Sequence, residues 1–466
     1  MLAGHAAALA RAHALFLQRR DADALPHARA AVAAMPRRAD AWTLLGIVQQ
    51  RLGQAHAAEA AYDAALRADP DYADAWTNLG NLRRDRNDLA GTLRAFQHAM
   101  RCAPASPEPA YNLGVALEHF GQWAGALAAF EAAIECDSTH ADAHWNRALG
   151  LLRTGRFKEG FREYEWRFRR GEIAPREGVQ PVWDGRPLDG RTILVWAEQG
   201  FGDALQFLRF VPEVARRGGR VVLEVMDGLQ GLASRVDGVA EVIVRGSAPP
   251  AFDTHVALMS LPHVLGLAPA PSPAGAPYLR ACDARLAHWR ARLAARGHAP
   301  VQALAIGLVW AGNPALRNSR ERSPGFDVVR PLLDIPGVRV FSLQKGAGRA
   351  DLAGASLPAN FVDLDAEIAD FDDTAAAIAQ LDLVVTCDTA VAHLAGALGK
   401  RVFVMLPHTP DWRYGLDPHA SPWYPTMRLF RQATRGDWSD VLARISRALA
   451  ETVASLPAQA LAAAHA

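Results

Sequence analysis

Three short segments of this sequence combine glycine, hydroxyl, acidic and basic residues in patterns that suit the binding of a phosphorylated ligand. The segment 198–203 (EQGFGD) joins two glycines, which permit close backbone approach, to Asp203. The segment 383–393 (LVVTCDTAVAH) runs from an apolar stretch into a helix start. The segment 310–323 (WAGNPALRNSRERS) holds three arginines within six residues. Arginine fits phosphate oxygens because its donors form a fork, so phosphate chemistry is the first class to consider.

Asp203 has two roles open to it. It either caps the N-terminus of the helix that follows, or projects into a cleft as a general base. The position expected for the third glycine of a dinucleotide fingerprint is Leu205. A nicotinamide cofactor is therefore poorly supported, and no cofactor is expected.

The segment around Asp388 predicts an anion site at a helix start. Asp388 or Thr389 supplies the N-cap, Ala390 follows, and the free N–H groups of the first turn attract negative charge. His393 comes one turn later, close enough to join a phosphate or sugar oxygen. A purely structural role for this histidine stays open.

The arginine-rich segment offers Arg317, Arg320 and Arg322 to a diphosphate, with a solvated charge cluster as the alternative reading. Asn313 in the same loop is a further donor-binding candidate. Gln344 and Lys345, after the next predicted strand, are weaker candidates of the same kind.

Apolar runs that precede these segments predict the strands that position them. In the C-terminal two thirds, strand-like runs alternate with helical ones, which indicates parallel strands joined by crossover helices. Two successive α/β units predict two Rossmann-like halves with a cleft between them. In such sheets ligands bind at the carboxyl ends of the strands, which is where all these segments fall. The predicted strand runs are TILVWAE, RVVLEV, EVIVR, HVALMS, ALAIGLVWAG, VRVFSLQK, FVDLD, LDLVVTCD and RVFVML.

The N-terminal third repeats with a period of 34 residues. Gly46, Gly80 and Gly114 share this spacing, as do the aromatic residues at 62, 96, 130 and 164. Each period predicts two helices, with Pro36, Pro70 and Pro104 at the exits of the leading periods. The pattern resembles the tetratricopeptide repeat family over residues 39 to about 168, with a degenerate repeat before Pro36. The resemblance implies a solenoid with an extended concave face that binds a partner.

Asn78, Asn112 and Asn146 recur at the same period. Their amides offer donors and an acceptor that suit an extended peptide backbone, and the resemblance to repeat-fused glycosyltransferases implies a peptide-binding groove. The alternative is that they form local helix-turn bonds.

Composition narrows the class of protein further. The 466 residues include 50 Lys and Arg against 49 Asp and Glu, a net charge of +1, so a nucleic-acid partner is not expected. The four cysteines, scattered along the chain, show no metal-binding spacing. We expect a cytoplasmic protein with no bound metal and no transmembrane segment.

The motifs AEQGFGDALQF, GLVWAGNP with RERS, and DTAVAHLAGALGKRV together resemble the ADP-heptose:lipopolysaccharide heptosyltransferase family, glycosyltransferase family 9, over residues 190 to 435. The resemblance implies the metal-independent GT-B fold and inverting transfer from a nucleotide-diphosphate sugar. It assigns the catalytic base to Asp203 and the donor diphosphate site to Asp388, Thr389 and His393, with Arg320 or Arg322. The family's Asp-Thr-Gly is Asp-Thr-Ala here, which leaves the donor sugar and the acceptor open.

The expected organisation is a repeat solenoid at 1–168, a linker at 169–190, an acceptor-side Rossmann-like domain at 191–297, a donor-side domain at 298–456 and a tail at 457–466. The expected function is hexosyl or heptosyl transfer to a hydroxyl of a protein or glycan, with the repeats recruiting acceptor or partner. Two alternatives remain: a repeat scaffold with a degenerate transferase half, and a GT-B sugar-nucleotide epimerase. The aromatic segment 411–432 is expected to pack beneath the cleft, with Trp412 or Arg413 able to reach the donor.

Overall fold

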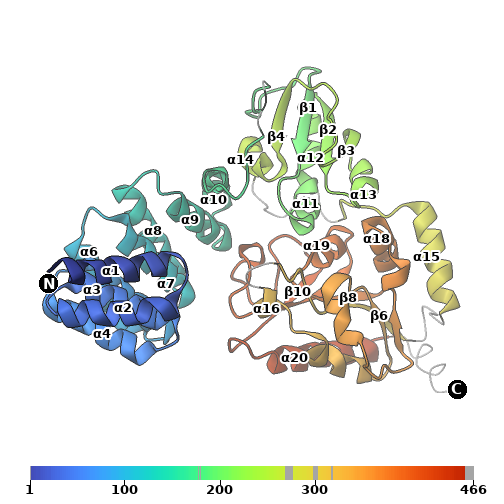
Figure 1. The fold of residues 1–466 in the computed structure, drawn as a ribbon. Helices are drawn as coiled ribbons and strands as arrows, with labels where there is room; N and C mark the ends of the chain where they lie inside the picture. The colour runs from blue at the N-terminus through green and yellow to red at the C-terminus, as the bar shows by residue number, and fades with distance from the viewer. Residues whose placement is uncertain are drawn as a thin grey trace. The chain divides into compact units, whose positions relative to one another are not determined.

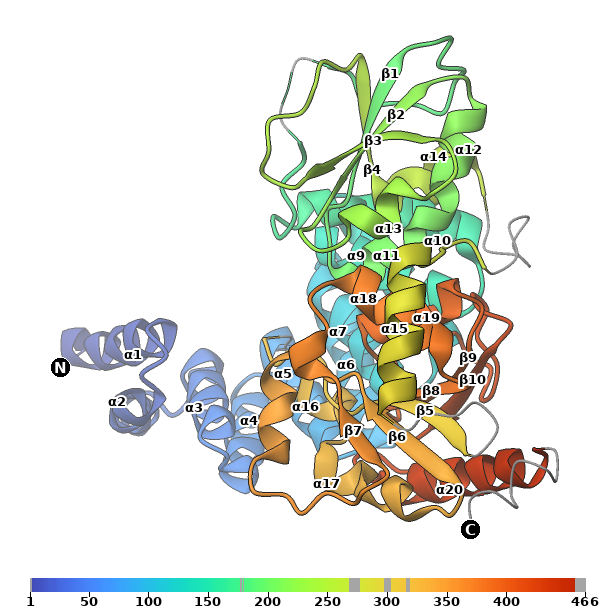
Figure 2. The same cartoon turned by 90° about the vertical axis from the view of Figure 1, so that its right-hand side faces the viewer.

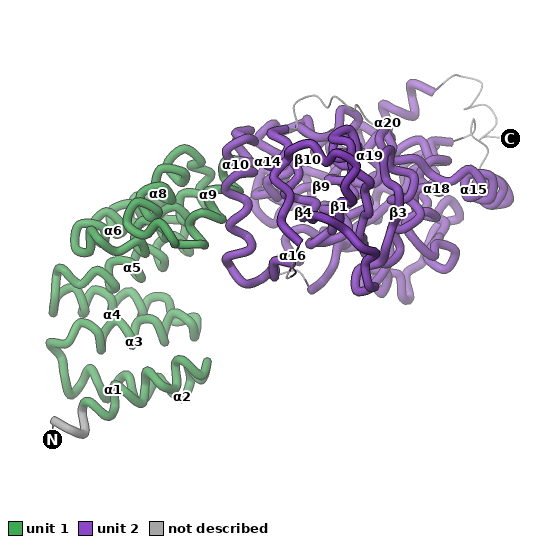
Figure 3. The backbone as a smooth tube through the Cα atoms, turned by 90° about the horizontal axis from the view of Figure 1, so that it is seen from above, with its two compact units in different colours: residues 1–151 green, residues 152–466 purple. Residues whose placement is uncertain are grey.

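The computed structural model describes residues 2–176, 178, 180–267, 277–296, 303–315 and 319–456. Arg317 and the tail at 457–466 lie outside the described residues. The chain divides into two compact units, Met1–Leu151 and Leu152–Ala466 (Figure 3). The division falls inside the region 1–168 that carries the repeat pattern, so the last helix of that pattern belongs to the second unit.

Unit 1 is a stack of antiparallel helix pairs (Figure 1), which confirms the predicted helical solenoid. The leading pair, before Pro36, is also present. Its helices are α1 (Leu2–Leu17), α2 (Asp21–Ala34), α3 (Ala39–Arg51), α4 (Ala55–Ala68), α5 (Ala73–Asp85), α6 (Leu89–Cys102), α7 (Pro107–His119), α8 (Trp123–Cys136) and α9 (Ala141–Arg153).

The periodic glycines and aromatic residues pack against each other within each pair. A Cβ added at Gly46 would lie 2.4 Å from the ring of Tyr62, and one at Gly114 would lie 2.4 Å from the ring of Phe130. Only glycine lets the two helices approach this closely over a buried ring. The period of 34 therefore encodes a packing contact.

The turn inside each pair also follows the period. Gly53 has φ +75°, and the Gly53 and Gln54 N–H groups donate to the carbonyls of Gln50 and Gln49 at 3.0 and 2.9 Å. This is the Schellman arrangement, which requires a left-handed residue after the helix. Asn87 takes the same conformation with φ 59°, as asparagine can.

Unit 2 contains two open sheets whose strands all run parallel, as the alternating pattern predicts. The first has the order β3-β2-β1-β4 and the second the order β10-β9-β8-β5-β6-β7. The strands are β1 (Thr192–Trp196), β2 (Arg220–Val225), β3 (Val239–Val244), β4 (Thr254–Ala257), β5 (Leu304–Val309), β6 (Val338–Ser342), β7 (Phe361–Asp363), β8 (Leu383–Cys387), β9 (Arg401–Leu406) and β10 (Met427–Arg431).

Helices cover both sheets and fill the space between them (Figures 1 and 2). Within the unit, α11 contacts α19, α13 contacts α18, and α15 packs along α18. The helices are α10 (Phe157–Tyr164), α11 (Phe201–Phe207), α12 (Val211–Arg216), α13 (Gln230–Ser234), α14 (Leu261–Leu265), α15 (Asp283–Ala295), α16 (Ser319–Arg322), α17 (Phe326–Val329), α18 (Phe371–Gln380), α19 (Ala390–Ala397) and α20 (Ser439–Ala454). Short 3-10 turns are η1 (Glu165–Arg169), η2 (Leu208–Phe210), η3 (Leu258–Ser260), η4 (Arg330–Asp334), η5 (Gly346–Leu352), η6 (Asp365–Glu367) and η7 (Trp412–Tyr414).

Two local features were not predicted. The helical segment between β1 and β2 is divided into α11, η2 and α12, because Pro212 has no N–H to continue the helical ladder. The aromatic segment 411–432 buries Trp412, Trp423 and Tyr424, and it also contributes β10, which pairs in parallel with β9.

Candidate functional site

Each sheet has one place where the strand order reverses. In the first sheet it lies between β1 and β4, and in the second between β5 and β8. Connections leave such neighbouring strands in opposite directions, which opens room for a ligand at their carboxyl ends. The segments after β1, β5 and β8 are those that carry Asp203, Arg322 and Asp388.

Asp203 uses its two carboxylate oxygens differently. Oδ2 accepts a hydrogen bond from the Gly200 N–H at 2.9 Å, which closes the first turn of α11. Oδ1 accepts from Nη2 of Arg413, which comes from the second sheet's side of the unit. The side chain is 22% exposed, so it is within reach of a ligand.

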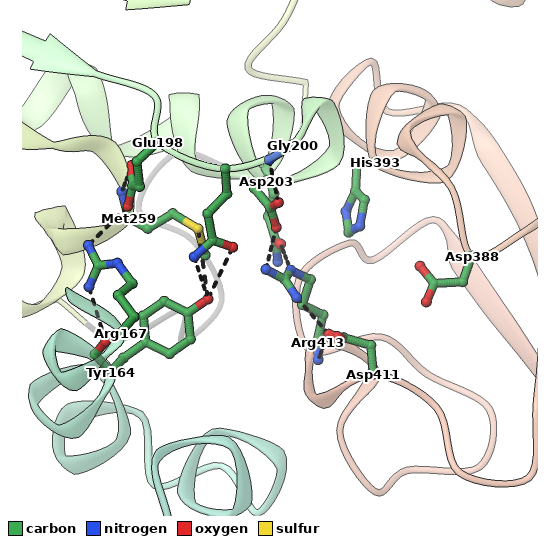
Figure 4. A network of polar contacts seen from close by, with 12 residues as sticks. Tyr164, Arg167, Glu198, Gly200, Asp203, Met259, Asp388, His393, Asp411 and Arg413 are labelled. Atoms are coloured by element: carbon green, nitrogen blue, oxygen red, sulfur yellow. Dashed lines mark hydrogen bonds and ion pairs between the residues drawn. The ribbon is translucent and has the colours of Figure 1, made fainter. Parts of the chain in front are cut away.

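Arg413 lies in η7, in the chain that follows β9. Its Nη1 donates to Asp411 Oδ1 at 2.7 Å and its Nε donates to Gln206 Oε1 at 3.0 Å. Figure 4 shows Asp203 and Asp411 on either side of this guanidinium. The sequence indicated only that Arg413 was able to reach a donor. Its place after the carboxyl end of a strand was the signal that would have ranked it higher.

Asp388 is buried, and two side chains contact its carboxylate. Tyr414 Oη donates to Oδ1 at 2.8 Å, and Arg322 Nη2 lies 2.6 Å from Oδ2. The same Arg322 nitrogen donates to the Asp388 carbonyl at 3.2 Å. Burial raises the pKa of Asp388 above its usual range, although the Arg322 guanidinium opposes the shift. The loops after β5 and β8 are thus joined by one ion pair.

Thr389 is the N-cap residue of α19, one of the two residues expected there, and Ala390 begins the helix. The Thr389 side chain makes no capping bond, and its Oγ1 lies 3.0 Å from Thr386 Oγ1. The Asp388 side chain is engaged elsewhere.

His393 is buried on the first turn of α19. Its Nδ1 lies 3.2 Å from Tyr424 Oη. Burial, reinforced by the nearby Arg413 charge, lowers the pKa of His393 to about 3. The ring is therefore neutral at neutral pH. Figure 4 shows it between Asp203 and Asp388.

The remaining candidates in the arginine segment are spread out. Arg320 is exposed on α16, and Asn313 is exposed, with its Oδ1 accepting from the Ala315 N–H at 3.0 Å. Of the described arginines in this segment, the structure brings Arg322 alone to Asp388.

Gln344 and Lys345 hold the chain around them. The Gln344 Oε1 accepts from the N–H groups of Trp310 and Ala311 at 3.0 and 2.9 Å. Lys345 Nζ donates to the Asp365 carbonyl at 2.7 Å and pairs with the Asp365 carboxylate at 2.9 Å. Gln344 thereby shapes the loop that leads to Arg322.

Two buried N–H donors in this network have no hydrogen-bond partner within the described residues. They are Arg322 Nε and Gln206 Nε2. Buried donors are rarely left unpaired in native proteins, so each can take a hydrogen-bond acceptor that the described residues do not supply.

A second network, on the α10 side of β1, supports the Asp203 loop. Arg167 Nη2 pairs with Glu198 Oε1 at 2.9 Å and donates to Ser260 Oγ at 2.7 Å. Gln199 Nε2 donates a hydrogen bond to Tyr164 Oη at 3.0 Å. Figure 4 shows Tyr164, Arg167 and Glu198 beside the Asp203 loop. The residues that extend the repeat pattern thus hold the loop after β1 in place.

The periodic asparagines of the solenoid are partly engaged within their own helices. Asn78 Nδ2 donates to the Asp74 carbonyl at 2.7 Å and Asn112 Nδ2 to the Glu108 carbonyl at 2.8 Å. Asn146 Nδ2 instead donates to Tyr111 Oη at 3.3 Å. Local bonds therefore account for one donor in two of the three amides.

Other features of the described residues lie apart from this site. A pocket of about 480 Å³ is lined by Arg401, Met427, Arg428 and Glu451, among others, at the opposite ends of the strands. No group of three or more His, Cys, Asp or Glu side chains within the described ranges suits a metal ion. No helix in the same ranges is both long and apolar enough to span a membrane.

Comparison with known proteins identifies the repeats. Residues 43–107, 93–141 and 111–167 match the tetratricopeptide repeat family model. The solenoid is thus built of tetratricopeptide repeats, as predicted. The chain is also 32% identical over 337 residues to Protein FlbA of Caulobacter vibrioides, covering 66% of this chain and 54% of FlbA.

This chain spans about half the length of FlbA. Because unit 1 ends at Leu151 of 466 residues, the similarity extends into unit 2. Among solved structures, MamA from Desulfovibrio magneticus RS-1 is 16% identical, with a TM-score of 0.32 over 36% of this chain and 96% of MamA. A tetratricopeptide repeat protein from Thermus thermophilus, TTC0263, is 19% identical, with a TM-score of 0.32 over 35% of this chain and 90% of TTC0263.

Proposed function

We propose that unit 2 is a GT-B glycosyltransferase that moves a sugar from a nucleotide-diphosphate sugar to a hydroxyl of a protein or glycan in the cytoplasm. The observation that carries the proposal is the position of Asp203 opposite the start of α19. There its carboxylate lies beside Arg413, with His393, Asp388 and Arg322 nearby. The groups that inverting transfer requires, a base and a cluster of N–H donors, therefore stand together at the reversal points of both sheets.

The reaction is a direct displacement. Asp203 takes the proton of an acceptor hydroxyl, the oxygen attacks the anomeric carbon, and the bond to the diphosphate oxygen breaks. For this step, Oδ1 exchanges Arg413 for the acceptor hydroxyl. The bond from the Gly200 N–H to Oδ2 keeps the carboxylate oriented during the exchange.

Two arginines stabilise the negative charge of the leaving group in this proposal. Both are paired with carboxylates in the structure. Arg322 pairs with Asp388, and Arg413 pairs with Asp203 and Asp411. A diphosphate therefore competes for arginines that three carboxylates already hold.

Basic side chains and the first turn of α19 take the electrostatic role that a metal ion fills in other transferases. The proposal is therefore metal-independent transfer.

Unit 1 recruits a protein acceptor or partner in this proposal. Stacked tetratricopeptide repeats form an extended surface suited to a peptide. Asn78 and Asn112 keep their amide oxygens for that purpose, since each uses an N–H for its own helix.

The proposal is tested by a thermal-shift screen of the full chain against ADP-linked and UDP-linked sugars in the presence of a chelator. A ligand at about 100 times its Kd stabilises the folded state by about 2.7 kcal/mol. We expect at least one donor to raise the midpoint, and Arg322→Met to reduce the rise. Arg186→Met is the matched control, because the side chain of Arg186 is 84% exposed.

The alternatives predict other results. A scaffold with a degenerate transferase half shows no shift with any donor, which would contradict the proposal. An epimerase shows the shift but converts the nucleotide sugar with no acceptor added.

A further inference from the structure

Behind His393 runs a chain of hydroxyl groups that the proposed reaction does not use. His393 Nδ1 lies 3.2 Å from Tyr424 Oη, which lies 3.3 Å from Tyr278 Oη. Tyr278 Oη lies 2.9 Å from the Leu205 carbonyl oxygen. His393 and Tyr424 are both buried, so the hydrogen bond between them is shielded from solvent.

The donor and the acceptor of each hydrogen bond in this row of hydroxyl groups can be assigned by starting from the Leu205 carbonyl. The Leu205 carbonyl only accepts, so Tyr278 donates its single proton there. Arg209 Nη2 only donates, and it donates to Tyr278 Oη at 3.2 Å. The Tyr278 oxygen thus already accepts one hydrogen bond from a cation.

Tyr424 then has two neighbours that can accept its proton, Tyr278 Oη and His393 Nδ1. An imidazole nitrogen is a far stronger base than a phenol oxygen that already accepts from a guanidinium. The Tyr424 proton therefore points to Nδ1. In a neutral imidazole, a nitrogen that accepts leaves the ring proton on the other nitrogen.

The Nε2 side of the ring faces the first turn of α11. A Cβ added at Gly202 would lie 3.1 Å from His393 Cδ2 and 3.8 Å from Nε2. Gly202 directly precedes Asp203. The ring edge that carries the proton therefore lies next to the residue that precedes the proposed base.

We propose that Tyr424 is a positioning residue that holds His393 as the Nε2–H tautomer, so that a neutral histidine donates a hydrogen bond to a diphosphate oxygen. The second clause rests on the proposed function, whereas the first does not. The lowered pKa of His393 agrees with a neutral ring. Tyr424 acts through His393 and does not itself touch the ligand.

The tautomer is measured by 15N NMR of the full chain with 15N-labelled histidine at neutral pH and without ligand. The signals of His393 are those lost in His393→Gln. We expect a protonated Nε2 and an unprotonated Nδ1 in the wild type. Tyr424→Phe should shift the ring towards a mixture of tautomers, and Tyr278→Phe should leave the Nε2–H form in place.

Two results would overturn the assignment: a proton on Nδ1 in the wild type, or an unchanged pure Nε2–H form in Tyr424→Phe. Both are independent of activity, and a merely structural role for Tyr424 would not move the ring signals.

ADP serves as the probe for the second clause. The glutamine amide of His393→Gln reaches the position of Nε2, whereas the asparagine amide of His393→Asn reaches only that of Nδ1. We expect His393→Gln to keep ADP affinity within about 3-fold and His393→Asn to lose about 10-fold, the scale of one hydrogen bond. Equal losses in both variants would overturn the donor role. A wild type that has the Nε2–H tautomer but binds neither ADP nor UDP would contradict the proposed function and leave the assignment of Tyr424 standing.

Discussion

The carboxylate of Asp203 can serve both roles that the sequence leaves open, the helix cap and the proposed general base. Its Oδ2 closes the first turn of α11 while Oδ1 faces Arg413. The capping bond orients the carboxylate, and the other oxygen stays available to exchange partners. Capping and the proposed base role are thus compatible in one side chain.

At the same scale, burial of His393 makes stability depend on pH. The folded-state pKa is lowered to about 3, whereas an unfolded histidine titrates near about 6.5. Between these values the unfolded chain binds more protons, so stability is lost as pH falls below about 6.5. From about pH 7 to about pH 5, we expect the wild type to lose about 2 kcal/mol more than His393→Gln.

The measurement is urea unfolding of both proteins at the two pH values. Equal losses in wild type and variant would show that His393 does not stay neutral in the folded protein.

At the scale of elements, α10 and η1 hold the loop that carries Asp203. The side chains of Arg167 and Glu198 are each 1% exposed, and they pair at 2.9 Å. Burial raises the pKa of Glu198, an effect that the Arg167 charge opposes. The carboxylate therefore depends on this arginine to stay charged.

Arg167→Met should destabilise unit 2 by about 3 to 5 kcal/mol, because it leaves the Glu198 carboxylate buried without a charged partner. Adding Glu198→Gln should restore part of the loss. Arg186→Met, in an exposed pair, should cost no more than about 1 kcal/mol. Thermal unfolding of the four proteins is the check, and similar midpoints for Arg167→Met and Arg186→Met would refute the role of the buried pair.

Element types followed from the sequence where one pattern dominated. The period of 34 predicts the helix pairs because the same glycine meets the same aromatic ring in each. The strand β10 was not predicted, because its five residues, MRLFR, carry charges at the second and the last position and lie in an aromatic segment. The segment is a strand only because it pairs with β9, and its own residues do not predict that pairing.

The candidate site shows the same limit. Asp203, Asp388 and His393 follow predicted strands, so their meeting at the carboxyl ends could be anticipated. Arg413 and Tyr424 also follow a predicted strand, β9, but the path of their segment back towards α11 depends on the tertiary fold. Local sequence indicates which residues can do chemistry, and the order of the strands decides which of them meet.

At the scale of the whole molecule, each unit has its own separate task in this account. Combined Asn78→Ala, Asn112→Ala and Asn146→Ala should weaken capture of a protein acceptor, because three amides suited to a peptide backbone are lost. The thermal shift caused by a nucleotide sugar should stay unchanged. The check is transfer to the protein acceptor at a fixed donor concentration. Unaltered use of that acceptor would exclude the asparagines from its recognition.

In the proposed function, unit 2 transfers a sugar with Asp203 as the base. The most direct test of this role compares sugar transfer with donor binding in Asp203→Asn. The asparagine oxygen can still accept from the Gly200 N–H, so the fold of α11 is retained. Asp237→Asn is the matched control, because the side chain of Asp237 is 79% exposed. We predict that Asp203→Asn binds the nucleotide sugar as the wild type does but transfers it about 100 to 10,000 times more slowly. Transfer at the wild-type rate by a folded Asp203→Asn protein would contradict the account.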